Sequence, residues 1–260
     1  TNKSISLLLN NNNNNNNNNQ TRNNTLTIHN ENVLNNLANN ILKKNKNIIF
    51  LKKKSFDIWY NVNLKYPLLI REELLYKKVN KIIQRRFIED PFKLDPEIKK
   101  KQQFTPEDYK KFMAFGGSFG HNAPAGNHKI DEDSFNDTFL MTNVTPQEMT
   151  FNSGLWVILE NYCKSLMKNK KIKDINIFTG SFPSNKMTKI KNVNKSSSYI
   201  EMNIPTHMFK IIICKHIDFP NNLYINGFLM ENKPSIINEN IKKINMGKYS
   251  VSYKHICNVA

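Results

Sequence analysis

The clearest pattern of apolar and polar positions along the chain has a helical period. An apolar stripe recurs at i, i+3, i+7 and i+10, formed by Trp156, Leu159, Cys163 and Leu166. Positions with this spacing lie on one face of an α-helix. Asn152 or Ser153 can cap the start of such a helix, and the lysines that follow residue 167 suit the negative end of its dipole. The pattern predicts an amphipathic helix over 152–168 that buries one face.

Short β-like runs follow this helix. They are rich in β-branched and aromatic residues, are separated by Gly and Pro, and span Ile175–Phe178, Tyr199–Ile204, Met208–Cys214 and Leu223–Met230. Earlier in the chain, residues 68–86 are rich in helix formers and are predicted to be helical, and Pro91 and Pro96 then end any regular element. A long helix with strands around it predicts an α+β fold.

Composition divides the chain into three parts. Its 260 residues fit one large domain with an appendage. Residues 1–47 form an Asn-rich, low-complexity extension, with an unbroken Asn run at 10–19, and such a segment cannot build a core. We expect residues 48–86 to form a basic, partly helical N-terminal arm and residues 87–260 to form the principal domain.

The charge balance indicates the kind of partner. Lys and Arg number 38 and Asp and Glu 21, so the formal net charge is +17. Such a surplus favours a polyanion, nucleic acid first and an anionic membrane surface second. The basic stretch at 43–54 is either a solvated edge or part of this contact. No segment approaches the ~18 consecutive apolar residues that cross a membrane. A disulfide framework and a cysteine zinc site are excluded because the only cysteines are Cys163, Cys214 and Cys257.

A segment crowded with Gly, at 116–126, is typical of a loop that carries a functional site. Ordered motifs run through it and beyond it: Ser118-Phe119-Gly120-His121, Ala123-Pro124-Ala125-Gly126-Asn127, Asn152-Ser153-Gly154-Leu155-Trp156 and Pro205-Thr206-His207. In order and spacing they resemble the motifs of the DNA/RNA non-specific endonucleases with a ββα-metal, or His-Me finger, site. Within that family the nearest resemblance is to the mitochondrial endo/exonuclease G-like branch, and it runs from about residue 87 to the C-terminus.

The resemblance implies a ββα-metal nuclease fold, with a central, mainly antiparallel sheet flanked by helices. It implies that His121 is the general base, and an imidazole with a pKa of about 6.5 is suited to taking a proton from water near neutrality. It implies that Asn152 holds one hydrated magnesium ion, with manganese as an alternative. An amide oxygen suits a hard cation that keeps most of its waters.

Further residues receive roles only through the resemblance. Glu160 follows Asn152 by 160 − 152 = 8 residues, which is two α-helical turns plus about 80°, so we expect it on a neighbouring face. Its implied role is to engage the water shell of the metal. Asn143 matches a family Asn at the edge of the site that helps to orient the His. The implied substrate-binding positions are Ser118, Phe119, Lys129 and Lys164.

Phe119 departs from the family pattern, which has Arg two positions before the catalytic His. That Arg supplies a fixed cation near the scissile phosphate, whereas Phe supplies neither a charge nor a donor. Loss of one such group costs on the order of 10²–10³ in rate. Lys164 lies four residues after Glu160, where a basic residue keeps a positive charge nearby.

Two functions stay open from the sequence. The first is a magnesium-dependent, sequence-tolerant mitochondrial nuclease that binds DNA or RNA through phosphate contacts and hydrolyses its phosphodiester bonds. The second is a catalytically degenerate pseudoenzyme, retained as a structural or RNA-binding component of a larger mitochondrial assembly such as the mitochondrial ribosome. The sequence also leaves open whether the protein forms a homodimer.

Overall fold

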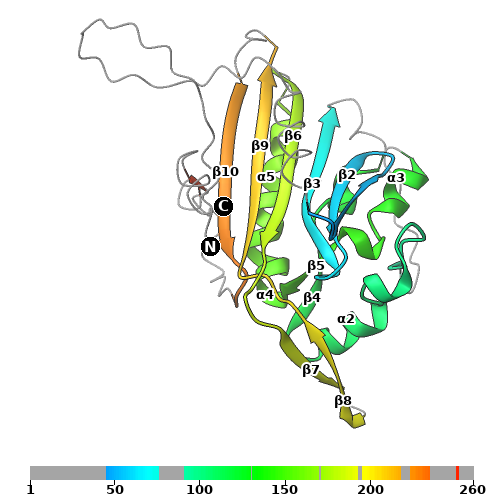
Figure 1. Ribbon diagram of the computed structural model, residues 1–260. Coiled ribbons are helices and arrows are strands. Elements are labelled where there is room, and N and C mark those ends of the chain that lie inside the picture. The colour runs from blue at the N-terminus through cyan, green and yellow to red at the C-terminus, as the bar shows by residue number, and fades with distance from the viewer. Residues whose placement is uncertain are drawn as a thin grey trace, which may run out of the picture.

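The structure is a computed structural model that describes residues 45–75, 91–129, 131–169, 171–192, 195–217, 223–234 and 250–251 (Figure 1). The predicted Asn-rich extension at 1–47 therefore lies almost wholly outside the described residues, as do Cys257 and residues 76–90. Within the described part, no helix is long and apolar enough to cross a membrane.

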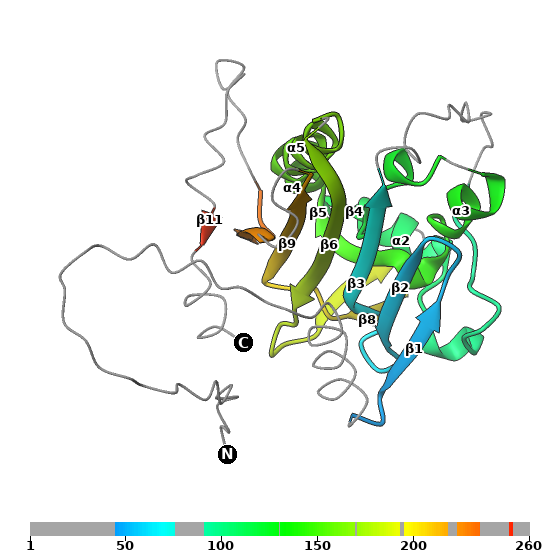
Figure 2. The same ribbon diagram turned by 90° about the horizontal axis from the view of Figure 1, so that it is seen from above.

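A seven-stranded sheet forms the body of the molecule, in the order β1-β2-β3-β6-β9-β10-β11 (Figures 1 and 2). All of its paired strands are antiparallel. The strands are β1 Ile48–Lys52, β2 Phe56–Asn61, β3 Tyr66–Leu75, β6 Ile172–Phe182, β9 His207–His216, β10 Leu223–Glu231 and β11 Ser250–Val251.

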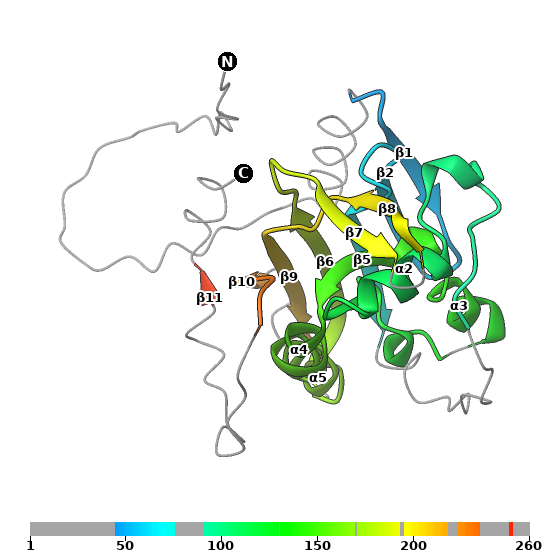
Figure 3. The same cartoon turned by 90° about the horizontal axis from the view of Figure 1, so that it is seen from below.

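Two hairpins and several short helices complete the described structure. One hairpin pairs β4 (Gly117–His121) with β5 (Val144–Glu148), and the other pairs β7 (Thr188–Asn192) with β8 (Lys195–Met202). Figure 3 shows the β7–β8 hairpin beside α2. The α-helices are α2 Pro106–Met113, α3 Glu132–Asp137, α4 Met149–Phe151 and α5 Val157–Met167; the 3₁₀ turns are η2 Lys100–Gln102, η3 Ala125–Asn127 and η4 Met141–Asn143; and the π-helical turn is η5 Asn152–Trp156. The α+β prediction, with a mainly antiparallel sheet flanked by helices, is confirmed.

Helix α5 covers one face of the sheet and buries the predicted apolar stripe. Trp156, Leu159 and Cys163 are at most 1% exposed, and the partly buried Leu166 packs against the same cluster. Ile177 and Ile212, paired across β6 and β9, lie in this cluster too. The helical period in the sequence therefore identified the side of the helix that meets the sheet.

The predicted helix over 68–86 is wrong for its first part, because residues 68–75 belong to β3. This segment is rich in Leu, Glu and Arg, which are good helix formers, but pairing with β2 and β6 overrides that weak preference. Ile70, Glu72 and Leu74 alternate toward the buried face. Residues 48–75 thus form three strands of the main sheet, and the division into an arm and a principal domain at residue 87 stays a prediction.

Helix α2 leads the chain into the β4–β5 hairpin. It starts at a capping box, in which Thr105 accepts from the Asp108 N–H and Asp108 accepts from the Thr105 N–H. The chain leaves the helix through Gly116, whose φ of 81° lies in the left-handed region that Gly adopts without strain. Strand β4 begins at the next residue.

Candidate active site

The β4–β5 hairpin presents His121 at the end of its first strand, opposite Val144. Side chains alternate across a strand, so Phe119 and His121 share one face of β4 while Ser118 faces the other way. Both rings on the first face contact Phe92, at centroid distances of 4.2 Å for Phe119 and 5.2 Å for His121. The face that carries His121 is therefore largely aromatic.

Two hydrogen bonds hold the start of the following helix against β4. The Asn152 amide Nδ2 donates to the Phe119 carbonyl at 3.4 Å, and the Trp156 indole Nε1 donates to the His121 carbonyl at 3.4 Å. Glu148 prepares this arrangement because its carboxylate accepts from the Phe151 N–H at 2.7 Å and caps the helix. The structure thus brings the helix start that carries Asn152 alongside the strand that ends at His121.

A π-helical turn over Asn152–Trp156 lies between α4 and α5, where the sequence predicted a regular α-helix. A π-turn inserts about one extra residue into the helical register. The eight-residue spacing from Asn152 to Glu160 then acts like about seven α-helical residues, or almost two full turns. The expected offset of about 80° is thereby largely removed. This count places Glu160 nearer to the Asn152 face than a regular α-helix would, and the expected role of Glu160 at the metal stays a prediction.

Glu160 lies in a partly buried position between charged neighbours. Burial raises the pKa of its carboxyl to about 7, the positive charges of Lys210 and Lys164 oppose that rise, and the negative charge of Glu72 adds to it. A carboxyl with this pKa exchanges protons near neutrality. Perturbed groups of this kind cluster at functional sites.

Asn143 clamps the loop that follows His121. Its Nδ2 donates to the carbonyls of Ala123 and Thr138, at 2.9 and 2.8 Å, and its Oδ1 accepts from the Ala123 N–H at 2.9 Å. The side chain is fully buried. Each of these bonds goes to the backbone, so Asn143 shapes the loop after β4 and has its amide group occupied there.

Phe119 is stacked between two other rings. Phe92 lies on one side at 4.2 Å and 20°, and Tyr109 lies on the other at 4.8 Å and 25°. The Phe119 ring is therefore held in apolar packing on both faces, and no face is left for a nucleobase. The sequence alone did not predict the two partners of Phe119, which come from separate segments.

The other predicted substrate-binding residues are dispersed. The Ser118 hydroxyl donates to the Gln147 carbonyl at 3.2 Å on the face away from His121. Lys164 belongs to α5, and its ammonium packs against the loop after β4, where a Cβ placed on Gly126 would be 2.5 Å from Nζ. Lys129 is half-buried at the end of that loop. Lys164 thus lies near the site, and Ser118 does not face it.

A buried layer behind the site was missed by sequence reasoning. Glu72 accepts from Asn127 Nδ2 at 3.1 Å and lies 2.9 Å from His128 Nε2, and His128 Nδ1 lies 2.8 Å from the Ser55 hydroxyl. These bonds tie β3 and the β1–β2 turn to the loop after His121. One feature of the sequence could have revealed this layer: Glu72 is a charged residue that alternates with the apolar Ile70 and Leu74 on one face of a strand.

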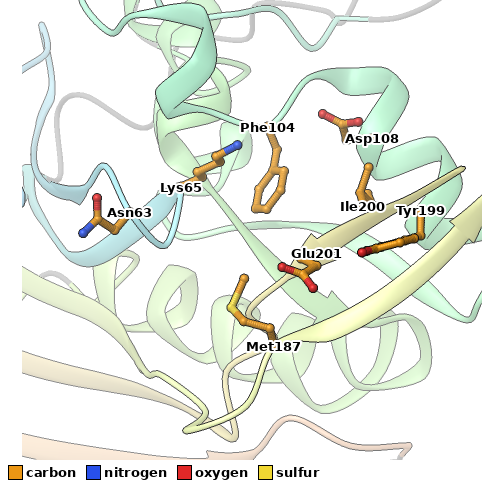
Figure 4. A pocket seen from close by; sticks show the side chains of 8 residues that line it. All are labelled: Asn63, Lys65, Phe104, Asp108, Met187, Tyr199, Ile200 and Glu201. Atoms are coloured by element: carbon orange, nitrogen blue, oxygen red, sulfur yellow. The ribbon is translucent and has the colours of Figure 1, made fainter.

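The chain also has an open groove of ≈ 550 Å³, away from these residues (Figure 4). The turn after β2, the start of α2 and the β7–β8 hairpin form it, and none of the predicted site residues lines it. Its walls are Asn63, Lys65, Phe104, Asp108, Met187, Tyr199, Ile200 and Glu201.

The donor set suits a hydrated hard cation better than a fully protein-bound metal. Among the described residues no group of three or more His, Cys, Asp or Glu side chains converges as a metal site. Asn152 uses its Nδ2 on the Phe119 carbonyl, which leaves its Oδ1 as an oxygen donor. A magnesium ion that keeps most of its waters needs few protein ligands.

A two-stranded hairpin followed by a helix, set against a large antiparallel sheet, defines the ββα-metal class of nuclease folds. A chain in the crystal structure of the EndoG/EndoGI complex has this fold. Its sequence is 21% identical to the present one, and the two structures align with a TM-score of 0.64. The alignment covers 84% of this chain and 86% of that chain. Residues 32–260 match the model of the DNA/RNA non-specific endonucleases, and the chain belongs to this family.

Named relatives resemble parts of the chain. Mitochondrial nuclease EXOG of Xenopus laevis is 32% identical over 55% of this chain and 39% of its own length. The mitochondrial nuclease of Saccharomyces cerevisiae is 33% identical over 48% and 38%. Human mitochondrial endonuclease G is 25% identical over 70% and 59%. The match thus spans less than two thirds of each relative.

The buried position of Asn143 predicts a large loss of stability in Asn143→Ala. The substitution leaves two buried carbonyls and one buried N–H without partners, and we expect the free energy of unfolding to fall by about 3 kcal/mol. Asn136→Ala, at an exposed position of α3, is the matched control. Urea denaturation measures both. Equal small losses would show that the Asn143 clamp does not stabilise the loop.

The raised pKa of Glu160 predicts a defined pH dependence. The folded protein keeps this proton up to about pH 7, whereas the unfolded chain loses it near 4.5. Stability therefore falls as pH rises between these values, by on the order of 2 kcal/mol relative to Glu160→Gln. Denaturation series in EDTA measure the difference, with Glu73→Gln, at an exposed position of β3, as control. If the free energies of unfolding of the wild type and of Glu160→Gln differed by the same amount at every pH, the prediction would be contradicted.

Proposed function

We propose that the protein is a magnesium-dependent nuclease that cleaves phosphodiester bonds of DNA or RNA, with manganese as an alternative ion. The observation that best supports this proposal is that three candidate groups lie on one hairpin and on the helix that follows it. His121 ends β4, Asn152 is hydrogen-bonded to that strand, and Glu160 lies further along the helix that carries Asn152. Family membership and the names of the relatives support the same reaction class.

In this proposal each residue has one task. His121 takes the proton of the attacking water through its imidazole. Asn152 holds the ion through Oδ1, and Glu160 accepts hydrogen bonds from the waters around it. When bound, the magnesium ion stabilises negative charge that develops on the phosphate and the leaving oxygen. Lys164 adds positive charge near the site.

The substrate is proposed to be bound with little sequence preference. The net charge of +17 supplies attraction to phosphates, which does not depend on base identity. The relatives named as mitochondrial nucleases support a mitochondrial location. Binding should therefore weaken steeply as salt is added.

A second candidate, a catalytically silent family member, is favoured by one observation. Phe119 is packed between Phe92 and Tyr109 and provides no charge for the scissile phosphate. The relatives compared above are named as nucleases, which lends no support to a place in the mitochondrial ribosome. Loss of one cation leaves His121 and Asn152 in place, so the active enzyme is the preferred proposal.

The two candidates give opposite results for Phe119→Arg. In an active enzyme the new guanidinium stacks between Phe92 and Tyr109, restores the missing cation and raises magnesium-dependent plasmid nicking roughly tenfold to hundredfold. In a silent protein the same change yields no magnesium-dependent cleavage, whatever its effect on the melting temperature.

Phe115→Arg is the matched control for added charge, because Phe115 is 52% exposed in the turn before β4. It should leave nicking near the wild-type rate, whereas His121→Ala should abolish it. Wild-type cleavage that persists in His121→Ala would defeat the mechanism. Cleavage absent from both the wild type and Phe119→Arg would favour the silent protein.

A further inference from the structure

Lys210 carries a charge in the middle of the sheet. Its side chain is buried, at 1% exposed, and its ammonium donates to Thr179 Oγ1 on the neighbouring strand at 2.5 Å. A buried ammonium is unfavourable unless hydrogen bonds and opposite charge compensate for the water that it has lost. An apolar residue would serve packing alone, so the charge itself requires an explanation.

The ammonium faces the helix start of the candidate active site. Lys210 Nζ lies 5.1 Å from the centroid of the Trp156 ring, within the range of a cation–π interaction. The same indole donates to the His121 carbonyl at 3.4 Å. A continuous line of contacts therefore runs from β6 through Lys210 and Trp156 to the end of β4.

Two acidic side chains, Glu160 and Glu72, lie in this region. Glu160 lies four residues after Trp156, and its carboxyl interacts electrostatically with both Lys210 and Glu72. Glu72 is fully buried, and its Oε2 has no hydrogen-bond donor among the described residues. The cation thus lies beside the ring that contacts the hairpin and within electrostatic range of Glu160.

We propose that Lys210 is a positioning residue of the candidate active site. Its ammonium holds the Trp156 ring in the orientation from which the indole N–H reaches the His121 carbonyl. It thereby fixes the end of β4 against the helix that carries Asn152 and Glu160. The effect on catalysis rests on the proposed nuclease function, whereas the effect on Trp156 does not.

The chain permits a direct measurement because it contains two tryptophans, Trp59 and Trp156. Labelling the full chain with ¹⁵N-tryptophan gives two indole N–H signals. In Lys210→Met, a substitution of similar length without the charge, we expect the Trp156 signal to shift and its exchange with solvent to accelerate roughly tenfold. Trp59 packs against Phe50 with ring centroids 5.2 Å apart and should be unaffected.

Lys53→Met is the matched control for removing a buried lysine. Lys53 is 8% exposed, and its ammonium pairs with Asp95 at 2.7 Å and Glu97 at 2.6 Å. It should destabilise the protein and leave the Trp156 signal in place. Thr179→Val is the milder second variant, because it keeps the charge but removes the hydroxyl that anchors it, and it should shift the Trp156 signal less in the same direction.

An unchanged Trp156 signal in folded Lys210→Met, or an equal change in Lys53→Met, would overturn the proposal. If Lys210→Met does not fold, an unchanged Trp156 signal in Thr179→Val overturns it in the same way. With an active wild type, Lys210→Met should lower kcat roughly tenfold to hundredfold and leave KM nearly unchanged. An inactive wild type would defeat the proposed function while the indole measurement still decides the role of Lys210.

Discussion

The hydrogen bond from the Trp156 indole to the His121 carbonyl connects the two halves of the candidate site. One half is the β4–β5 hairpin, and the other is the helix that begins at the π-turn. Trp156 is also part of the core between α5 and the sheet, so the same side chain anchors the helix and holds the hairpin. The position of His121 therefore depends on core packing as well as on the loop that surrounds it.

Charge is distributed unusually around this connection. The sheet face beneath α5 is largely apolar, yet Glu72 and Lys210 lie in it. Glu72 is fully buried and Lys210 is almost fully buried. Such groups contribute little to stability compared with apolar residues of the same volume. Their position behind His121 and Glu160 points to the site as the reason for their presence. The aromatic stack at Phe119 has the reverse character, because only apolar rings pack there.

Sequence reasoning predicted the parts of the fold that rest on local pattern. The helix stripe from Trp156 to Leu166 and the later strands follow from spacing, and the candidate site follows from motif order. The strand over residues 66–75 was missed because its helix formers conceal an alternation that only pairing with β2 and β6 enforces. The Phe92–Phe119–Tyr109 stack depends on contacts between distant segments, which no local window contains.

In the proposed mechanism the His121 imidazole acts as the general base of a magnesium-dependent nuclease. Chemical rescue tests it most directly, because free imidazole can replace a missing imidazole side chain in the space that it leaves. Plasmid nicking by the His121→Gly variant would be measured in magnesium with increasing imidazole at several pH values. The account predicts no cleavage without imidazole, and a rate that then rises with the concentration of its neutral form. A variant that cleaves as well as the wild type without imidazole would contradict the claim.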